Sequence, residues 1–109
     1  MVTVKIDKYK GYTVEGHARY AEPGKDIVCA SVSVLSQSVL MQLQEVAIVQ
    51  YKIEDEIYGS GDGLLAVKIL STDTKEVQTL INLLATGISE IAEQYPDHVK
   101  LEFIKFKEE

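Results

Sequence analysis

A histidine and the only cysteine of the chain lie twelve residues apart, separated by a loop that contains a Pro-Gly pair. They are His17 and Cys29, in the segment EGHARYAEPGKDIVCASVS (Glu15 to Ser33). A neutral imidazole within hydrogen-bond reach of a thiol can remove its proton and later protonate a leaving amine. The pair therefore predicts a cysteine nucleophile with a histidine base. The alternative is a buried cysteine with an unrelated histidine upstream, since free cysteines are among the most buried residues.

The position of Cys29 favours a reactive thiol. If Asp26 caps a helix, Cys29 is the third helical residue, where backbone N–H groups lack intrahelical partners. Those groups and the helix dipole stabilise negative charge, which lowers the pKa of a thiol. The N–H groups of Cys29 and Ala30 could also receive a developing oxyanion in acyl transfer.

Three further side chains could support this pair. Asp26 or Glu15 could orient the imidazole, and the sequence favours neither over the other. Ser33 lies one turn after Cys29 on the same predicted helix face, where it could line the site or hydrogen-bond the sulfur. The simpler alternatives are a plain helix cap for Asp26 and a packing role for Ser33.

The remaining motifs predict structure rather than chemistry. One cysteine and two histidines without ligand spacing predict no metal site. The segment GSGDG (59–63) lacks the Lys-Ser/Thr of a phosphate loop and lies between predicted strands, so it is interpreted as a hairpin turn. His98, beside Pro96 and Asp97, is interpreted as a turn or strand-start residue.

The elements that must position the cysteine and the histidine follow from hydrophobic periodicity. Strands are predicted at 2–7, 12–18, 50–58, 64–70 and 98–106. One helix is predicted at 26–49. A second helix is predicted from a cap at Thr72 or Asp73 to Pro96, with Glu76 at its third position. The strand at 50–58 is polar and predicted at an edge of the sheet, whereas the apolar strand at 64–70 is predicted to be central. Residues 1–109 thus form one α+β domain, a mixed β-sheet with two helices in the order β-β-α-β-β-α-β.

The first predicted helix is apolar along two lines. Its core-facing stripe comprises Val28, Val32, Leu35, Val39, Leu43 and Val46. Val34, Met41 and Ile48 form a second line, at intervals of seven residues. We expect this second line to be covered, either by the other helix or by a second subunit.

Composition limits the classes of function. The 109 residues are 46% hydrophobic with a net charge of −6, which describes an acidic globular protein and disfavours direct binding to nucleic acid. The single cysteine fits a reducing cytoplasm, and no signal peptide is visible at the N-terminus. The uncharged segment 27–44 contains seven Ser or Gln residues, too many for a membrane span. We therefore expect a soluble, cytoplasmic protein.

The segment GHA at residues 16–18, followed by a short loop and DIVCASVS at residues 26–33, resembles the ribosomal-processing cysteine protease family, Prp. Chain length and element order match this family as well. The resemblance implies a protease that removes the N-terminal extension of large-subunit ribosomal protein twenty-seven, cutting after a phenylalanine-containing segment. It implies no cofactor, a homodimer and no membrane partner.

The resemblance also implies roles for individual residues. His17 and Cys29 correspond to the catalytic dyad, and Asp26 and Ser33 to supporting residues. The loop Arg19 to Lys25 corresponds to a mobile substrate loop. Its residues of interest are Arg19, Tyr20, Pro23 and Gly24. Family members commonly carry Ala-Ala after the cysteine, where this chain has Ala30-Ser31, and we expect Ser31 to point away from the cysteine.

Two other functions remain alternatives. The chain could be a non-catalytic binding or assembly factor that binds the same basic ribosomal protein, because an acidic surface attracts a basic protein whether or not it is cleaved. A thiol-redox role is disfavoured, since the chain has no resolving cysteine. Whether His17 reaches Cys29 before a substrate binds stays open, because catalytic hydrogen bonds often tighten only in the complex.

Overall fold

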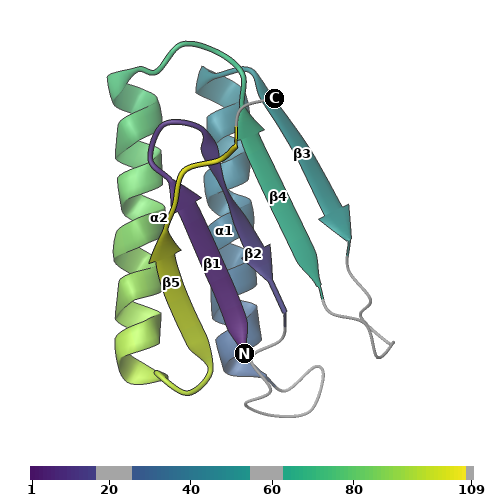
Figure 1. The fold of residues 1–109 in the computed structure, drawn as a ribbon, viewed down its shortest axis with the longest axis vertical. Helices are drawn as coiled ribbons and strands as arrows, with labels where there is room; N and C mark the ends of the chain where they lie inside the picture. Colours follow the sequence, from purple (N-terminus) through teal and green to yellow (C-terminus); the bar gives the residue numbers. More distant parts are fainter. Residues whose placement is uncertain (17–25, 55–62, 108–109) are drawn as a thin grey trace.

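The computed structural model describes residues 1–16, 26–54 and 63–107. The elements are β1 (Val2–Asp7), β2 (Gly11–Glu15), α1 (Ile27–Val46), β3 (Val49–Glu54), β4 (Leu64–Ile69), α2 (Lys75–Gln94) and β5 (Val99–Phe103). The strands form one sheet in the order β3-β4-β2-β1-β5, in which β1 and β5 are parallel and the other neighbours antiparallel. Both helices lie on the same face of this sheet (Figure 1). The predicted α+β class, element order and mixed sheet are confirmed.

The core lies between the sheet and the two helices. Val2, Val4 and Ile6 of β1 alternate with the half-buried Thr3 and Lys5 and are almost fully buried. Tyr12 of β2 is also fully buried, and its hydroxyl donates to the Ser36 carbonyl of α1 at 2.7 Å. Burial raises the pKa of the Tyr12 hydroxyl far above its usual range, so Tyr12 stays a neutral donor that ties β2 to α1.

The helix α1 is shorter than predicted, because the chain turns extended at Ala47 to enter β3. Its buried residues are Val28, Val32, Ser36, Val39, Leu40 and Leu43. Leu35 of the predicted stripe is only partly buried, and Val46 is 43% exposed. The stripe predicted from the sequence omits Ser36, because its side chain is polar. Ser36 can nevertheless be buried, since its hydroxyl donates to the Val32 carbonyl at 2.7 Å.

By length and composition, α1 is apolar enough to cross a membrane, although only 33% of the apolar window is buried within the chain. Its buried face nevertheless packs against the sheet as the core helix of a globular domain does. The low buried share instead reflects an outer face that is also apolar.

The helix α2 is capped one residue later than predicted. The sequence pattern predicts Thr72 or Asp73 as the N-cap, but the structure shows Thr74, whose hydroxyl accepts from the Val77 N–H at 3.3 Å. Glu76 is therefore the second helical residue rather than the third. Four residues of α2 are buried, Val77, Ile81, Leu84 and Ile88.

β3 and β4 pair as predicted, but both strands are shorter than the predicted ones. β3 lies at the edge of the sheet and β4 lies inside it, between β3 and β2. The predicted strand residues 55–58 and most of the GSGDG turn lie outside the described residues, as do residues 17 and 18 of the predicted second strand. β5 ends at Phe103, and the chain continues without strand structure to Lys107.

Candidate active site

Cys29 lies in the first turn of α1, where the sequence places it. Asp26 is the N-cap, with extended backbone (φ −83°, ψ 99°). Its Oδ1 accepts from the N–H of Val28 at 3.0 Å and from the N–H of Cys29 at 2.9 Å. The predicted cap and the third helical position of Cys29 are therefore both observed.

The same contacts correct one expectation about the backbone amides. The sequence predicts that the N–H groups of Cys29 and Ala30 are available to an oxyanion. In the structure the Cys29 N–H is bonded to the Asp26 carboxylate, and the Ala30 N–H is bonded to the Asp26 carbonyl at 3.0 Å. The reason is that Asp26 satisfies two separate donors, one through its side chain and one through the first intrahelical bond.

Cys29 is part-buried and packs against the hydrophobic core. It is thus neither sealed in the interior nor fully exposed. Packing on one side fixes the first turn, while the exposed remainder leaves a route for a reagent or substrate. This is the kind of environment in which reactive cysteines occur.

His17 lies outside the described residues, and so do Arg19, Tyr20, Pro23 and Gly24 of the predicted substrate loop. The structure does describe the two ends of that segment, Gly16 after β2 and Asp26 before α1.

Gly16 determines how the chain leaves β2. Its φ of +93° is one that residues with a side chain rarely adopt, and an added Cβ would collide with the Met1 carbonyl oxygen. Its N–H donates to the Gly63 carbonyl at 3.0 Å, which ties this point to the start of β4. Only glycine suits the position directly before His17.

The other predicted supporting residues lie around the start of α1 and the end of β2. Ser33 is exposed one turn after Cys29 on α1, and Glu15 is exposed at the end of β2. Ser31 donates to the Ile27 carbonyl at 2.6 Å within the helix. The Asp26 carboxylate accepts hydrogen bonds from two backbone N–H groups, whereas Glu15 is exposed with its carboxylate at the end of β2. Which of the two carboxylates orients the imidazole stays open.

Within residues 1–16, 26–54 and 63–107, no group of three or more His, Cys, Asp or Glu side chains could hold a metal ion. His98 occupies the turn before β5, where its N–H donates to the Tyr95 carbonyl at 3.0 Å and its own carbonyl accepts from the Val2 N–H at 2.9 Å. This agrees with its interpretation as a turn residue.

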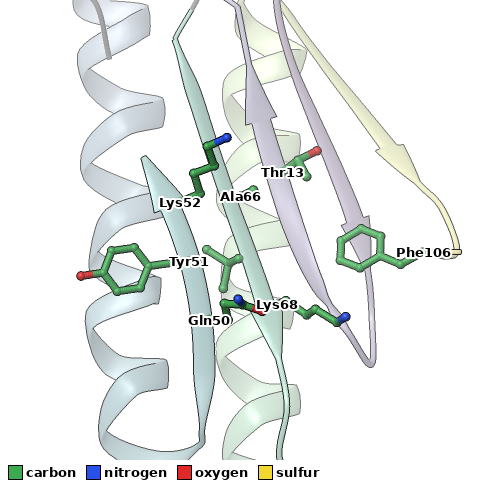
Figure 2. Close-up of a pocket in the computed structure, with 8 residues that line it drawn as sticks. Thr13, Gln50, Tyr51, Lys52, Ala66, Lys68 and Phe106 are labelled. Atoms are coloured by element: carbon green, nitrogen blue, oxygen red, sulfur yellow. The ribbon is translucent and has the colours of Figure 1, made fainter. Parts of the chain in front are cut away.

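A hollow of about 250 Å³ lies on the sheet away from the cysteine (Figure 2). Lys52, Ala66 and Thr13 line it from one row across β3, β4 and β2, with Phe106 beside them. This row belongs to the sheet face opposite the helices, because the strand residues that alternate with it are buried against them. The hollow exists because the central strands carry small residues there, and it is separate from the Cys29 site.

The chain matches the family described as Cysteine protease Prp over residues 1–100. It is similar to the ribosomal processing cysteine protease Prp of Staphylococcus aureus, with 30% identity over 111 residues that span 94% of this chain and 99% of the relative. The Prp protein of Mycoplasma genitalium is 27% identical over 99 residues, 88% of this chain and 91% of the relative.

Solved structures show the same fold. The S. aureus Prp protease, crystallised with a covalently linked product peptide, superposes with a TM-score of 0.79 at 24% identity, covering 95% of this chain and all of that one. A Streptococcus mutans protein gives a TM-score of 0.74 at 24% identity, covering 95% and 97%. The family match and the sequence relatives show that this chain belongs to the Prp family of ribosomal processing cysteine proteases.

Proposed function

We propose that this chain removes the N-terminal extension of large-subunit ribosomal protein twenty-seven, cutting after a phenylalanine-containing segment. A cysteine protease of the Prp family needs a cysteine nucleophile, and Cys29 is the only cysteine. The observation that carries the proposal is the position of Cys29, part-buried in the first turn of α1. His17 is the proposed base, with Asp26 or Glu15 as the acid that orients it.

The proposed reaction has two steps. The imidazole of His17 takes the thiol proton, Cys29 Sγ bonds to the scissile carbonyl carbon, and the tetrahedral intermediate collapses with loss of the amine, which receives that proton. A water molecule then gives a proton to His17 and attacks the thioester. The C–S bond breaks, the new carboxyl end leaves, and the proton returns to the sulfur.

The hydrogen bonds of Asp26 narrow the choice of oxyanion donor. The Ala30 N–H makes an ordinary intrahelical bond, which it would keep during the reaction. The Cys29 N–H donates to the Asp26 side chain at 2.9 Å, and a rotation of this carboxylate would release that hydrogen bond. We therefore assign the oxyanion to the Cys29 N–H, exchanged from Asp26 when substrate arrives.

The charge of the chain supports a basic substrate. A net charge of −6 attracts a positively charged ribosomal protein and repels nucleic acid, which speeds encounter with the free protein rather than with assembled RNA. A single free cysteine fits a reducing compartment, which supports a cytoplasmic location for the reaction. We further propose that the chain acts as a homodimer, since the exposed Val34, Met41 and Ile48 at the α1 side offer apolar surface for a second subunit.

The test is incubation with the N-terminally extended ribosomal protein, followed by sequencing of the new N-terminus. The wild type should produce one cut, and His17→Ala should abolish it. His98→Ala is the matched control, because it removes the chain's other histidine, and it should leave cleavage near the wild-type rate. Tight binding without a new N-terminus would contradict the proposal and favour an assembly factor.

A further inference from the structure

The hollow of about 250 Å³ on the sheet face opposite the helices has the chemistry of a ligand site (Figure 2). We call it the sheet hollow. The side chains that define it are those of Thr13, Gln50, Lys52, Ala66, Lys68 and Phe106. Its floor is low because Thr13 and Ala66 are small and pair with each other across β2 and β4, while Gly11, which pairs with Lys68, has no side chain.

Phe106 forms a fixed wall of the sheet hollow. The segment that follows β5 is anchored to β1, since the Ile104 N–H donates to the Ile6 carbonyl at 2.9 Å and the Phe106 N–H donates to Asp7 Oδ2 at 2.8 Å. Asp7 is buried and also holds the β1–β2 turn. The ring of Phe106 is half-buried at the edge of the hollow (Figure 2). An aromatic ring held in this way offers a stacking surface to another planar ring.

The charge of the sheet hollow is opposite to that of the chain. The chain has a net charge of −6, whereas the described residues that line the hollow include two lysines and no Asp or Glu. Lys52 pairs with Ala66, which lies two residues before Lys68 on β4. Lys52 and Lys68 are thus diagonal neighbours on one face, roughly 7–8 Å apart, and both flexible side chains can reach one anionic group between them.

Both lysines are available to such a group. Lys52 Nζ lies 2.8 Å from Glu54 Oε1, but the two side chains are 67% and 56% exposed, and an exposed ion pair of this kind contributes little. A phosphate can therefore displace the Glu54 carboxylate. Lys68 is exposed and forms no ion pair within the part of the chain that the structure describes.

Two uncharged polar side chains complete the sheet hollow. Gln50 pairs with Lys68 across β3 and β4, and its exposed carboxamide can both donate and accept hydrogen bonds. Thr13 Oγ1 is buried and has no hydrogen-bond partner among the described residues, which leaves hydrogen-bonding capacity unused at the floor. A ligand with hydroxyl or amide groups in addition to its anionic group can use this capacity.

Size and charge together select the ligand. A volume of about 250 Å³ is below the range of about 300–1,000 Å³ typical of sites for larger ligands, so one ring system and one anionic group suit it. Two lysines balance the roughly two negative charges of a phosphate monoester at pH 7, twice the charge of a carboxylate. A polymer of nucleotides stays disfavoured, because its charges extend beyond the hollow onto an acidic protein.

We propose that the sheet hollow binds a nucleoside monophosphate. The base stacks on Phe106, the phosphate lies between Lys52 and Lys68, and the sugar hydroxyls face Gln50. This site is separate from the Cys29 thiol and rests on neither proteolysis nor the proposed substrate.

Titration of the full chain with three probes tests the combined recognition of ring and phosphate. Adenosine 5′-monophosphate should bind with a Kd between about 0.01 and 1 mM, the range expected for a ligand of this size. Adenosine and inorganic phosphate should each bind at least about tenfold more weakly, since each makes only part of the contacts. In nuclear magnetic resonance spectra, the amides of Thr13, Ala66 and Lys68 should shift with the nucleotide.

The two edge strands supply a matched pair of lysines. Lys100 on β5 lies on the same sheet face, pairs with Glu102 at 2.9 Å just as Lys52 pairs with Glu54, and does not line the hollow. Lys52→Gln and Lys68→Gln should each raise the Kd for the monophosphate at least about fivefold and leave that for adenosine unchanged. Lys100→Gln should change neither Kd.

The aromatic wall is tested by Phe106→Leu, which keeps an apolar side chain. This variant should raise the Kd for the monophosphate and for adenosine at least about fivefold, and leave that for inorganic phosphate unchanged, because only stacking is lost. Thermal melting checks that the variant is folded. If it is not, Lys68→Gln, at an exposed position, still decides the question.

Three results would overturn the proposal. The monophosphate could bind no more tightly than inorganic phosphate, or Lys100→Gln could weaken binding as much as Lys52→Gln, which would indicate general attraction to surface lysines. The third is tighter binding of the tripeptide Glu-Phe-Glu than of the monophosphate, lost in Lys68→Gln, which would assign the hollow to an acidic segment of a protein instead.

Discussion

The two ends of β2 use the same structural devices for different purposes. At the far end, Gly11 has a φ of +133° and an added Cβ would meet the Val67 carbonyl oxygen, while Asp7 accepts hydrogen bonds from backbone N–H groups. At the site end, Gly16 has a φ of +93° and Asp26 accepts from the N–H groups of Val28 and Cys29.

What differs is the surroundings of each carboxylate. Asp7 is 5% exposed and joins the β1–β2 turn, through Tyr9 and Lys10, to the C-terminal segment, through Phe106. Asp26 accepts hydrogen bonds from the turn that follows it and stands beside a part-buried thiol. One end closes the fold, and the other presents the proposed nucleophile. The comparison teaches that a carboxylate capping backbone amides marks a site only when a reactive side chain lies next to it.

Removal of the Cys29 thiol should have the largest effect, and it should affect cleavage activity without affecting stability. Cys29→Ala should lower the rate of cleavage of a substrate-derived peptide at least ~1,000-fold, because no other side chain can form the covalent intermediate. Its melting temperature should stay close to that of the wild type. Ser33→Ala, one turn further along α1, should lose less than about tenfold. Cleavage by Cys29→Ala at the wild-type rate would disprove the mechanism.

The two glycines form a matched pair. Gly11→Ala and Gly16→Ala should each lower the free energy of unfolding by at least about 1–3 kcal/mol, because alanine is strained at positive φ. Only Gly16→Ala should also reduce turnover per folded molecule, since the next residue is the proposed base. Denaturant unfolding and peptide cleavage at 10 °C would measure both effects. Equal loss of turnover in the two variants would mean that Gly16 has no special link to the site.

The role of Asp26 as the cap of α1 can be tested separately from the role of its negative charge. Asp26→Ala should destabilise the fold by about 0.5–2 kcal/mol, and Asp26→Asn by much less, because asparagine caps helices as well as aspartate does. If Asp26 orients His17, Asp26→Asn should still lose turnover, measured with the same peptide. Unchanged turnover in Asp26→Asn would point to Glu15 as the orienting acid.

The smallest expected effect is the pH dependence of the stability that Asp7 contributes. Burial alone would raise the pKa of Asp7, but hydrogen bonds from the backbone N–H groups of Phe106, Tyr9 and Lys10 outweigh it and hold the pKa below its ordinary value of 3.8. Because the folded pKa is depressed, the ionised carboxylate stabilises the fold above pH 3.8, and this stabilisation is lost as the pH falls through the lower folded value.

Urea unfolding of the wild type and Asp7→Asn between pH 2 and pH 7 measures this contribution. The wild type should be more stable than the variant at neutral pH, and the difference should shrink at the acid end. Asp26→Asn is the matched comparison at the other end of β2. A difference between wild type and Asp7→Asn that does not change with pH would show that Asp7 acts through shape rather than charge.

Local sequence signals were sufficient for much of the fold. Periods of two and 3.6 residues identified the first strands and both helices, because one face of each must be apolar to be buried. The strand at 64–70 was identified by its continuous apolar run, and the polar strand at 50–58 by the Gly-rich turn between the two. Local signals also located Asp26 as a cap, since aspartate before an apolar helix is a strong start signal. The cap of α2 was misplaced because Thr72, Asp73 and Thr74 are all suitable cap residues, and only packing of the helix on the core selects among them.

The sequence by itself determined the order of the elements, their buried faces and the position of Cys29 in the first turn of a helix, because these depend on neighbouring residues. Tertiary structure alone decided that α2 leaves Val34, Met41 and Ile48 exposed, and that Asp7 holds the C-terminal segment. Such contacts depend on the directions of side chains and on segments up to 99 residues apart, which no local pattern encodes.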